Sequence, residues 1–183
     1  MKQLHALSGS LVLLFVVFHL ANHLTAWWGV AAHQRILEAL RTVYRHPLGE
    51  GLLLAAVLFQ SVSGVLMVGK YWRGRARWSG WFRLQVWSGV YLAFFFANHV
   101  GAVLVGRYVL AVDTNLAFAT AGLWTMPQAL FFWPYYSLGV MALFGHVAAV
   151  CRGRLKANGL AWLVIGFGGA VLLGILLGFA ALA

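Results

Sequence analysis

Residues 8–23 read SGSLVLLFVVFHLANH, and residues 88–99 read SGVYLAFFFANH. Each stretch is apolar apart from its serine, asparagine and histidine side chains, and in each a histidine follows the glycine by ten residues. Runs of this kind belong to helices long enough to cross a membrane. Because an imidazole within such a run is costly without a partner, His19 and His99 are the first candidates for a functional site.

The composition extends the membrane assignment to the whole chain. Of the 183 residues, 63% are hydrophobic and 9% are charged, whereas a soluble domain carries about 25% charged residues. Five apolar segments without an internal charge can each cross a hydrocarbon core of about 30 Å. These segments are residues 7–28, 51–69, 84–106, 132–150 and 160–181. We predict an all-α, polytopic membrane helical bundle with five transmembrane helices, in which residues 1–183 form a single domain.

The basic residues predict the orientation of the bundle. The N-terminus and the connections after the second and fourth segments hold nine Lys and Arg residues, and the connections after the first and third hold four. By the positive-inside rule, the N-terminus is expected to be cytoplasmic and the C-terminus outside. The same rule accounts for the net charge of +10, so nucleic acid is not an expected partner.

The repeated histidines point to a shared ligand. The first and third segments run in the same direction, so equal spacing places His19 and His99 at a similar depth in the outer half. Two imidazoles at one depth could hold one metal between them, and ligation of haem iron would satisfy both rings. Cys151 is the single cysteine, which excludes a CxxCH attachment and favours b-type haem. The alternative is that both histidines hydrogen-bond to neighbouring helices or to water.

Two further histidines are candidates for the same chemistry. His23 lies one helical turn beyond His19 and could replace it as the ligand, contact a propionate, line a quinone pocket or reach the headgroups. In a weaker repeat of the second and fourth segments, Gln60 aligns with His146 in the inner half. His146 could bind a second haem, hydrogen-bond to a quinone or be a satisfied interior histidine. Because amides seldom ligate haem, Gln60 interrupts this pair; we predict one haem and leave a second open.

The remaining features are expected to be structural. His5, His33 and His46 are expected to be solvated or interfacial side chains. Residues 35–45 have helical spacing and predict a short helix in the membrane interface, and residues 108–130 are expected to rest against the membrane. In the last segment a small residue recurs every fourth position, which allows close helix packing. These small residues are Gly166, Ala170, Gly174 and Gly178.

A family resemblance follows from the order of these residues. Along the chain they are His5, Gly9, His19, Leu20, Gln85, Gly89, His99 and, just before a basic loop, His146. This order resembles the cytochrome b membrane anchor of succinate dehydrogenase and fumarate reductase, in its single-chain, five-helix, diheme form. The resemblance implies that His19 and His99 ligate the outer haem and that His146 is one ligand of the inner haem. Gln60 stands where the other inner ligand is expected.

The resemblance also implies a function. The chain would be a non-catalytic electron-transfer subunit of an oxidoreductase in the bacterial inner membrane. An iron–sulfur subunit, itself bound to a flavoprotein, would dock on the cytoplasmic face, and electrons would pass between the succinate or fumarate site and a membrane quinone. Two alternatives stay open: a free-standing membrane cytochrome b electron carrier, and a haem-free structural subunit of a membrane complex.

Overall fold

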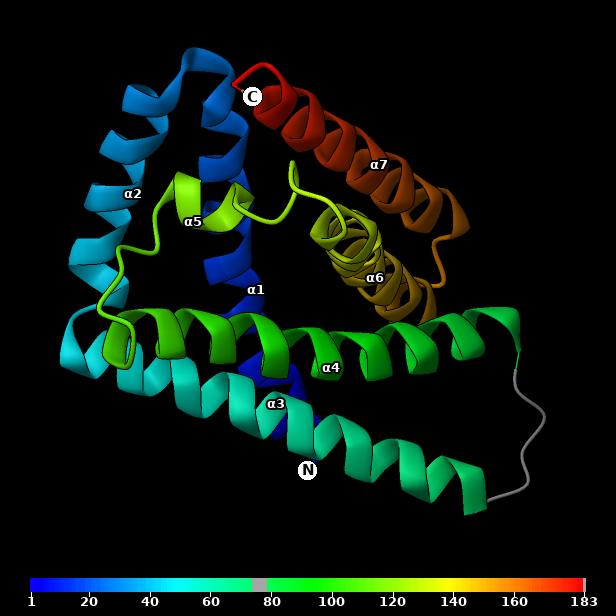
Figure 1. Cartoon of the computed structure of the whole chain (residues 1–183). Coiled ribbons are helices and arrows are strands. Elements are labelled where there is room, and N and C mark those ends of the chain that lie inside the picture. The colour runs from blue at the N-terminus through cyan, green and yellow to red at the C-terminus, as the bar shows by residue number, and fades with distance from the viewer. Residues whose placement is uncertain (74–78, 183) are drawn as a thin grey trace.

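The computed structural model describes residues 1–73 and 79–182, so Arg75 and Arg77 of the predicted basic connection lie outside the described residues. Within the described part, every regular element is helical, and five helices are long and apolar enough to cross a membrane (Figure 1). They are α1 (Lys2–Leu24, continued by the 3-10 turn η1, Thr25–Trp28), α3 (Pro47–Arg73), α4 (Gly80–Tyr108), α6 (Gln128–Leu155) and α7 (Asn158–Ala180). The predicted five-helix membrane bundle is confirmed.

Most ends of the long helices extend past the predicted apolar segments, because polar residues suit the ends of helices. Pro47 begins α3, a position where the fixed proline φ fits and no amide hydrogen is missed. Glu50 lies in the first turn of the same helix, where a negative charge is favourable. The Ser79 hydroxyl caps α4 by accepting a hydrogen bond from the Phe82 amide at 3.2 Å. The predicted apolar segments therefore mark the middle of α3, α4 and α6, whereas in α1 and α7 only the N-terminal end extends past the segment.

The bundle is built from pairs of packed helices. α1 packs against α3 and α7, α4 packs against α3 and α6, and α6 packs against α7. Figure 1 shows α3 and α4 running side by side and α7 reaching the C-terminal end of α1. The residues of the repeated stretches consequently lie on two helices, α1 and α4, that face a common interior.

The small residues of α7 allow close packing at one end of that helix. A Cβ atom at Gly174 would lie 2.9 Å from Leu24, and one at Gly178 would lie 3.1 Å from Trp27. The Trp27 indole nitrogen donates a hydrogen bond to the Gly174 carbonyl at 2.7 Å. A Cβ at Gly166 would meet nothing within 4 Å, so the predicted ribbon of small residues is in contact only at its C-terminal end.

The first connection contains the predicted short helix. α2 (Val30–Tyr44) folds back onto α1 after Gly29, whose φ of +92° is accessible to glycine without strain. Its buried face presents His33, Leu37 and Arg41, which are spaced four residues apart and lie on one side of the helix. The helix is confirmed, whereas its placement in the membrane interface stays a prediction.

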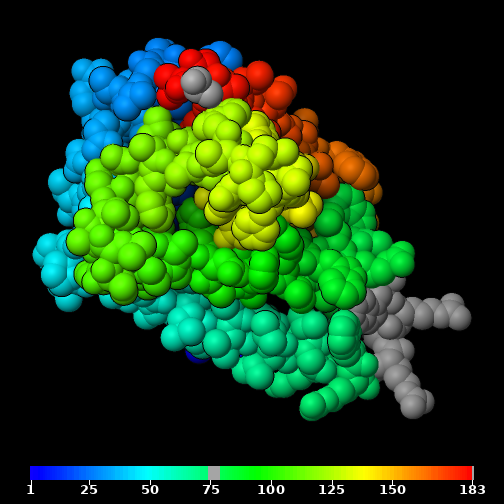
Figure 2. All heavy atoms as spheres, viewed as in Figure 1, coloured from blue at the N-terminus to red at the C-terminus, as the bar shows by residue number. Residues whose placement is uncertain are grey.

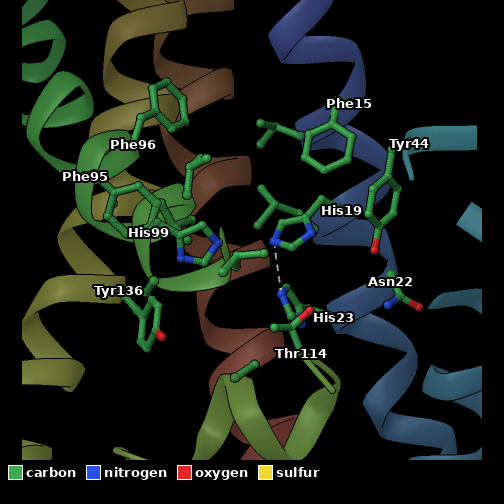
Figure 3. A pocket seen from close by; sticks show the side chains of 18 of the residues that line it. Phe15, His19, Asn22, His23, Tyr44, Phe95, Phe96, His99, Thr114 and Tyr136 are labelled. Atoms are coloured by element: carbon green, nitrogen blue, oxygen red, sulfur yellow. Dashed lines mark hydrogen bonds between the residues drawn. The ribbon is translucent and has the colours of Figure 1, made fainter. Parts of the chain in front are cut away.

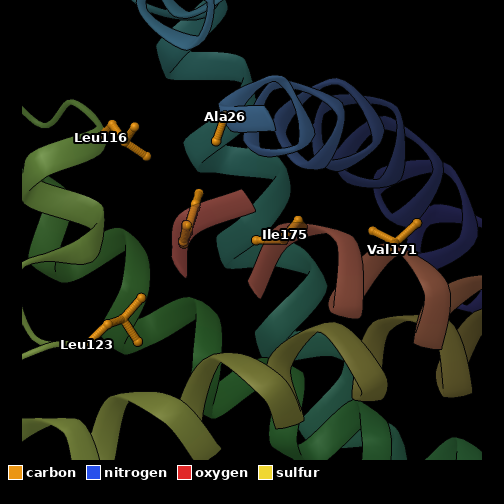
Figure 4. Packing of buried hydrophobic residues seen from close by; sticks show 6 residues of the cluster. Ala26, Leu116, Leu123, Val171 and Ile175 are labelled. Atoms are coloured by element: carbon orange, nitrogen blue, oxygen red, sulfur yellow. The ribbon is translucent and has the colours of Figure 1, made fainter. Parts of the chain in front are cut away.

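The connection between α4 and α6 packs against the bundle. It contains the five-residue helix α5 (Leu116–Thr120), and Figure 2 shows this connection, in yellow-green, between α2 and the helices α6 and α7. Leu116 and Leu123 are buried in the main apolar cluster (Figure 4). The other buried members of this cluster are Ala26, Val171, Ile175 and Phe179. The connection thus covers the ends of α1 and α7, and its contact with the membrane stays a prediction.

Each of the three acidic residues pairs with an arginine at this end of the bundle. The buried Arg41 guanidinium contacts Glu38 and Asp113, both at 2.6 Å. Arg107 of α4 contacts Glu50 of α3 at 2.8 Å. These pairs join α2 to the connection that contains α5, and α3 to α4, and they hold in place the elements that surround the candidate site.

Candidate functional site

Among the described residues, the spaces between the helices include two cavities that contain histidines. The first cavity has a volume of about 270 Å³ and is lined by His19, His23, His33 and His99 among mainly apolar side chains. The second cavity has a volume of about 550 Å³ and is lined by residues that include His5, Gln60 and His146. The two repeated stretches line both cavities, because their histidines face the first and their glycines, Gly9 and Gly89, face the second. Each repeat therefore contributes residues to both cavities.

His19 and His99 face each other across the first cavity. Their ring centroids lie 6.0 Å apart, with the ring planes inclined by 71° (Figure 3). Phe15 stacks on His19 with centroids 5.6 Å apart, and Phe95 stacks on His99 with centroids 5.1 Å apart. The structure thus brings together the two histidines that the repeat singled out, and aromatic rings hold both imidazoles in position. Their role as metal ligands stays a prediction.

A chain of hydrogen bonds extends from this pair to α2. His19 Nε2 lies 3.2 Å from His23 Nε2, the contact drawn as a dashed line in Figure 3. His23 Nδ1 in turn lies 3.4 Å from His33 Nε2, which also accepts a hydrogen bond from the Asn22 amide at 3.3 Å. These hydrogen bonds link the first cavity to the buried face of α2. Both ring nitrogens of His23 therefore have a partner.

The expectation that His33 is solvated or interfacial was wrong. Its side chain is 1% exposed, the most deeply buried large side chain of the described residues, and its Nδ1 atom has no hydrogen-bond partner. The reason is that α2 folds back onto α1 and turns its apolar side inward. His33 shares that side with Leu37, four residues later, and this spacing was the available signal in the sequence.

Burial of His33 predicts a pH dependence of stability. Burial, with a smaller contribution from the nearby Arg41 guanidinium, lowers the pKa of the His33 imidazole from its ordinary value of 6.5. The unfolded chain then binds this proton more readily than the folded protein, so stability is retained above pH 6.5 and declines as the pH falls below it. We expect the melting temperature in detergent to drop less between about pH 7.5 and about pH 5.5 for His33→Gln than for wild type. Equal drops in the two proteins would contradict this assignment.

One end of the first cavity is polar and basic. Arg45 and Arg107 line it together with Glu50 and Thr114. The Arg45 Nη2 atom donates to the Thr114 hydroxyl at 2.9 Å, while its Nε atom is buried without a partner. Arg107 makes two hydrogen bonds to the Glu50 carboxylate, at 2.8 and 3.1 Å. The cavity therefore has an apolar body with facing imidazoles and a basic end, an arrangement suited to an amphipathic ligand with acidic groups.

The second cavity contains the other predicted residues together with His5. His146 lines it from α6, and Gln60 lines it from α3. His5 is half-buried and contacts Ser63 at 2.7 Å and Gln60 at 3.0 Å, so its side chain is not fully solvated. Its place in the membrane interface stays a prediction. His46 is exposed, as expected. The contacts of His5 could not be predicted, because it lies in the first turns of α1, where a polar residue is common, and its partners are on α3.

Comparisons with protein-family models, with curated proteins and with solved structures found no match for this chain. Among the described residues, no group of three or more His, Cys, Asp or Glu side chains is placed to hold a metal ion. The His19–His99 pair has two members and does not form a group of three. The functional assignment therefore depends on the two cavities and on the residues that line them.

Proposed function

We propose that this chain is a haem b-containing membrane anchor of a succinate:quinone oxidoreductase or fumarate reductase, with His19 and His99 as the axial ligands of the iron. The observation that carries the proposal is the 6.0 Å separation of their ring centroids across an apolar cavity. Imidazole–metal bonds are about 2 Å long, so two rings on opposite sides of one metal have centroids about 6 Å apart. The separation of His19 and His99 therefore fits a haem iron held between them.

The chemistry of the first cavity supports the same group. Haem has a flat apolar macrocycle and two propionates, and it supplies one-electron transfer when it is bound. The apolar lining suits the macrocycle, while the basic end holds Arg45, with a buried Nε atom that lacks a partner, and Arg107. Guanidinium groups bind carboxylates by paired hydrogen bonds, so these two arginines are the residues expected to bind the propionates.

The surrounding residues would prepare His19 for ligation. Phe15 and Phe95 stack on the two imidazoles and restrict their rotation. A ring nitrogen that binds iron cannot also hydrogen-bond, so His19 Nε2 would have to release His23 Nε2. His23 would keep its contact with His33. We therefore assign His23 a positioning role beside His19. The apolar lining of the first cavity would lower the local dielectric around the iron and exclude water.

The polar ends of the helices support the proposed partners. Lys2 of α1 and Arg154 of α6 line the second cavity at the end of the bundle where the predicted cytoplasmic connections lie. Arg152, near the C-terminal end of α6, adds another positive charge there. A basic face suits an iron–sulfur subunit that carries a flavoprotein, and membrane quinone would be the other redox partner. The location proposed is the cytoplasmic membrane of a bacterium.

Purification from native membranes tests the function as a whole. The tagged chain is extracted in mild detergent, its reduced-minus-oxidised spectrum is recorded, and the co-purifying subunits are identified by mass spectrometry. We expect a b-type band together with a flavoprotein and an iron–sulfur subunit. A band without these partners would favour the free-standing cytochrome b, and the partners without a band would favour the haem-free structural subunit. Either result would overturn the proposal.

A further inference from the structure

One of the two proposed axial ligands has no hydrogen bond to fix its ring. Among the described residues, neither ring nitrogen of His99 is hydrogen-bonded, and its aromatic neighbours are Phe95, Tyr136 and His19. Metal-binding histidines usually keep their orientation through a hydrogen bond from the other ring nitrogen to a carboxylate, a carbonyl or water. The orientation of the His99 imidazole must therefore come from the rings that pack against it.

Phe95 is the ring that lies nearly parallel to His99. The two residues are one helical turn apart on α4, with ring centroids 5.1 Å apart and planes inclined by 12° (Figure 3). Tyr136 instead meets His99 edge-on, with centroids 6.2 Å apart and planes inclined by 86°. Because tilting the imidazole would drive its edge into the face of Phe95, the position of Phe95 sets the plane of the His99 ring.

Tyr135 of α6 holds Phe95 in turn. Its buried ring stacks on Phe95 with centroids 4.8 Å apart and planes inclined by 28°. Its hydroxyl donates a hydrogen bond to the Phe95 backbone carbonyl at 3.2 Å. In an α-helix this carbonyl also accepts from the amide four residues later, which here belongs to His99. Tyr135 therefore contacts both the ring that packs against His99 and the backbone that carries it.

A second tyrosine hydroxyl joins the same two helices at a different place. The Tyr91 hydroxyl of α4 donates to the Tyr135 carbonyl at 2.9 Å. Tyr91 lies about two helical turns before His99, and its ring contacts Phe94. Each tyrosine thus supplies one hydroxyl hydrogen bond between α4 and α6, but of the two it is Tyr135 that stacks on Phe95.

We propose that Tyr135 is a positioning residue for the haem of the first cavity, which fixes the plane of the His99 imidazole through Phe95. The inference rests on the proposed function. The ring planes of His19 and His99 are inclined by 71°. The relative orientation of two axial imidazoles affects how the iron d orbitals split, and so affects the g values of ferric low-spin haem and its reduction potential. Tyr135 would therefore act on the electronic properties of the haem without touching the iron.

Electron paramagnetic resonance of the oxidised, purified complex tests this role. The low-spin signal that is lost in His99→Ala identifies the haem of the first cavity. We expect Tyr135→Phe, which removes the hydroxyl and keeps the ring, to retain this haem as low-spin. Its signal should broaden and its largest g value should fall, because the imidazole planes relax from their steep inclination, and its reduction potential should shift. Phe95→Leu, which removes the stacked ring and keeps the Tyr135 hydroxyl, should give a larger change in the same direction.

Tyr91→Phe is the matched control, because it removes the other hydroxyl hydrogen bond between α4 and α6. We expect the thermal midpoint in detergent to fall by a similar amount in Tyr91→Phe and in Tyr135→Phe. The g values and the reduction potential should stay at their wild-type values in Tyr91→Phe. A change in the signal of Tyr135→Phe alone would then report orientation of the ligand rather than loss of stability.

The outcomes separate this inference from the proposed function. Wild-type g values in Tyr135→Phe or in Phe95→Leu would overturn the inference and leave the function in place. Equal shifts in Tyr135→Phe and Tyr91→Phe would also overturn it, because the signal would then respond to any loosening between α4 and α6. A wild-type protein without haem would overturn both the inference and the proposed function.

Discussion

Replacement of His19 or His99 by alanine is expected to remove all low-spin haem from the first cavity. Each residue would supply one of the two imidazole bonds to the iron, and the two rings face each other with centroids 6.0 Å apart, so loss of either one removes a bond that a low-spin haem needs. The measurement is the low-spin haem content of the purified chain, with the reduced-minus-oxidised spectrum as a second readout. We expect the double variant to give the same loss at this site as either single variant, because both ligands act on one iron.

His23→Ala is the matched control for this prediction. His23 lies one turn from His19 on the same helix and contacts it at 3.2 Å, so its removal disturbs the surroundings without removing a proposed ligand. We expect the haem of the first cavity to stay low-spin in this variant. Loss of that haem in His23→Ala, with retention in His19→Ala, would make His23 the ligand instead. An unchanged spectrum in both His19→Ala and His99→Ala would contradict haem ligation at this pair.

A methyl group added at Gly139 is expected to disturb the same site from α6. A Cβ there would lie 2.5 Å from the ring of Phe95, so that ring must move. Phe95 is stacked between His99, at 5.1 Å, and Tyr135, at 4.8 Å, and has little room to do so. We expect Gly139→Ala to destabilise the fold by about 1–3 kcal/mol, as overpacking of a core does, and to lower the haem content of the first cavity.

Gly166→Ala is the control for this second prediction. Gly166 also lies within a long helix, but a Cβ there would meet nothing within 4 Å. The thermal midpoint in detergent and the haem content of this variant should match those of wild type, while both should fall for Gly139→Ala. Equal midpoints and equal haem contents for the two variants would show that Phe95 moves without cost and does not support His99.

The helices, the α2 segment and the His19–His99 pair could be predicted from the sequence. Each apolar segment can be recognised from its own residues, because a helix that crosses a membrane needs only sufficient length and hydrophobicity. The pairing of His19 and His99 was predicted from equal spacing on two segments that were expected to run in the same direction. The structure brings the two rings together although α1 and α4 cross at a steep angle (Figure 1). The α2 helix was predicted from the helical spacing of residues 35–45. Each of these predictions depends on residues close together in the chain, or on one simple relation between two segments.

The surroundings of His33 and His5 depended on the tertiary structure. His33 is buried because the turn at Gly29 folds α2 onto α1, and nothing in the residues next to it specifies that angle. His5 contacts Ser63 and Gln60, which lie more than fifty residues away on another helix. The sequence by itself determined how many helices span the membrane and which two histidines meet. The tertiary structure determined how the other histidines are paired, because a hydrogen-bond partner is set by the register between helices rather than by the hydrophobicity of either one.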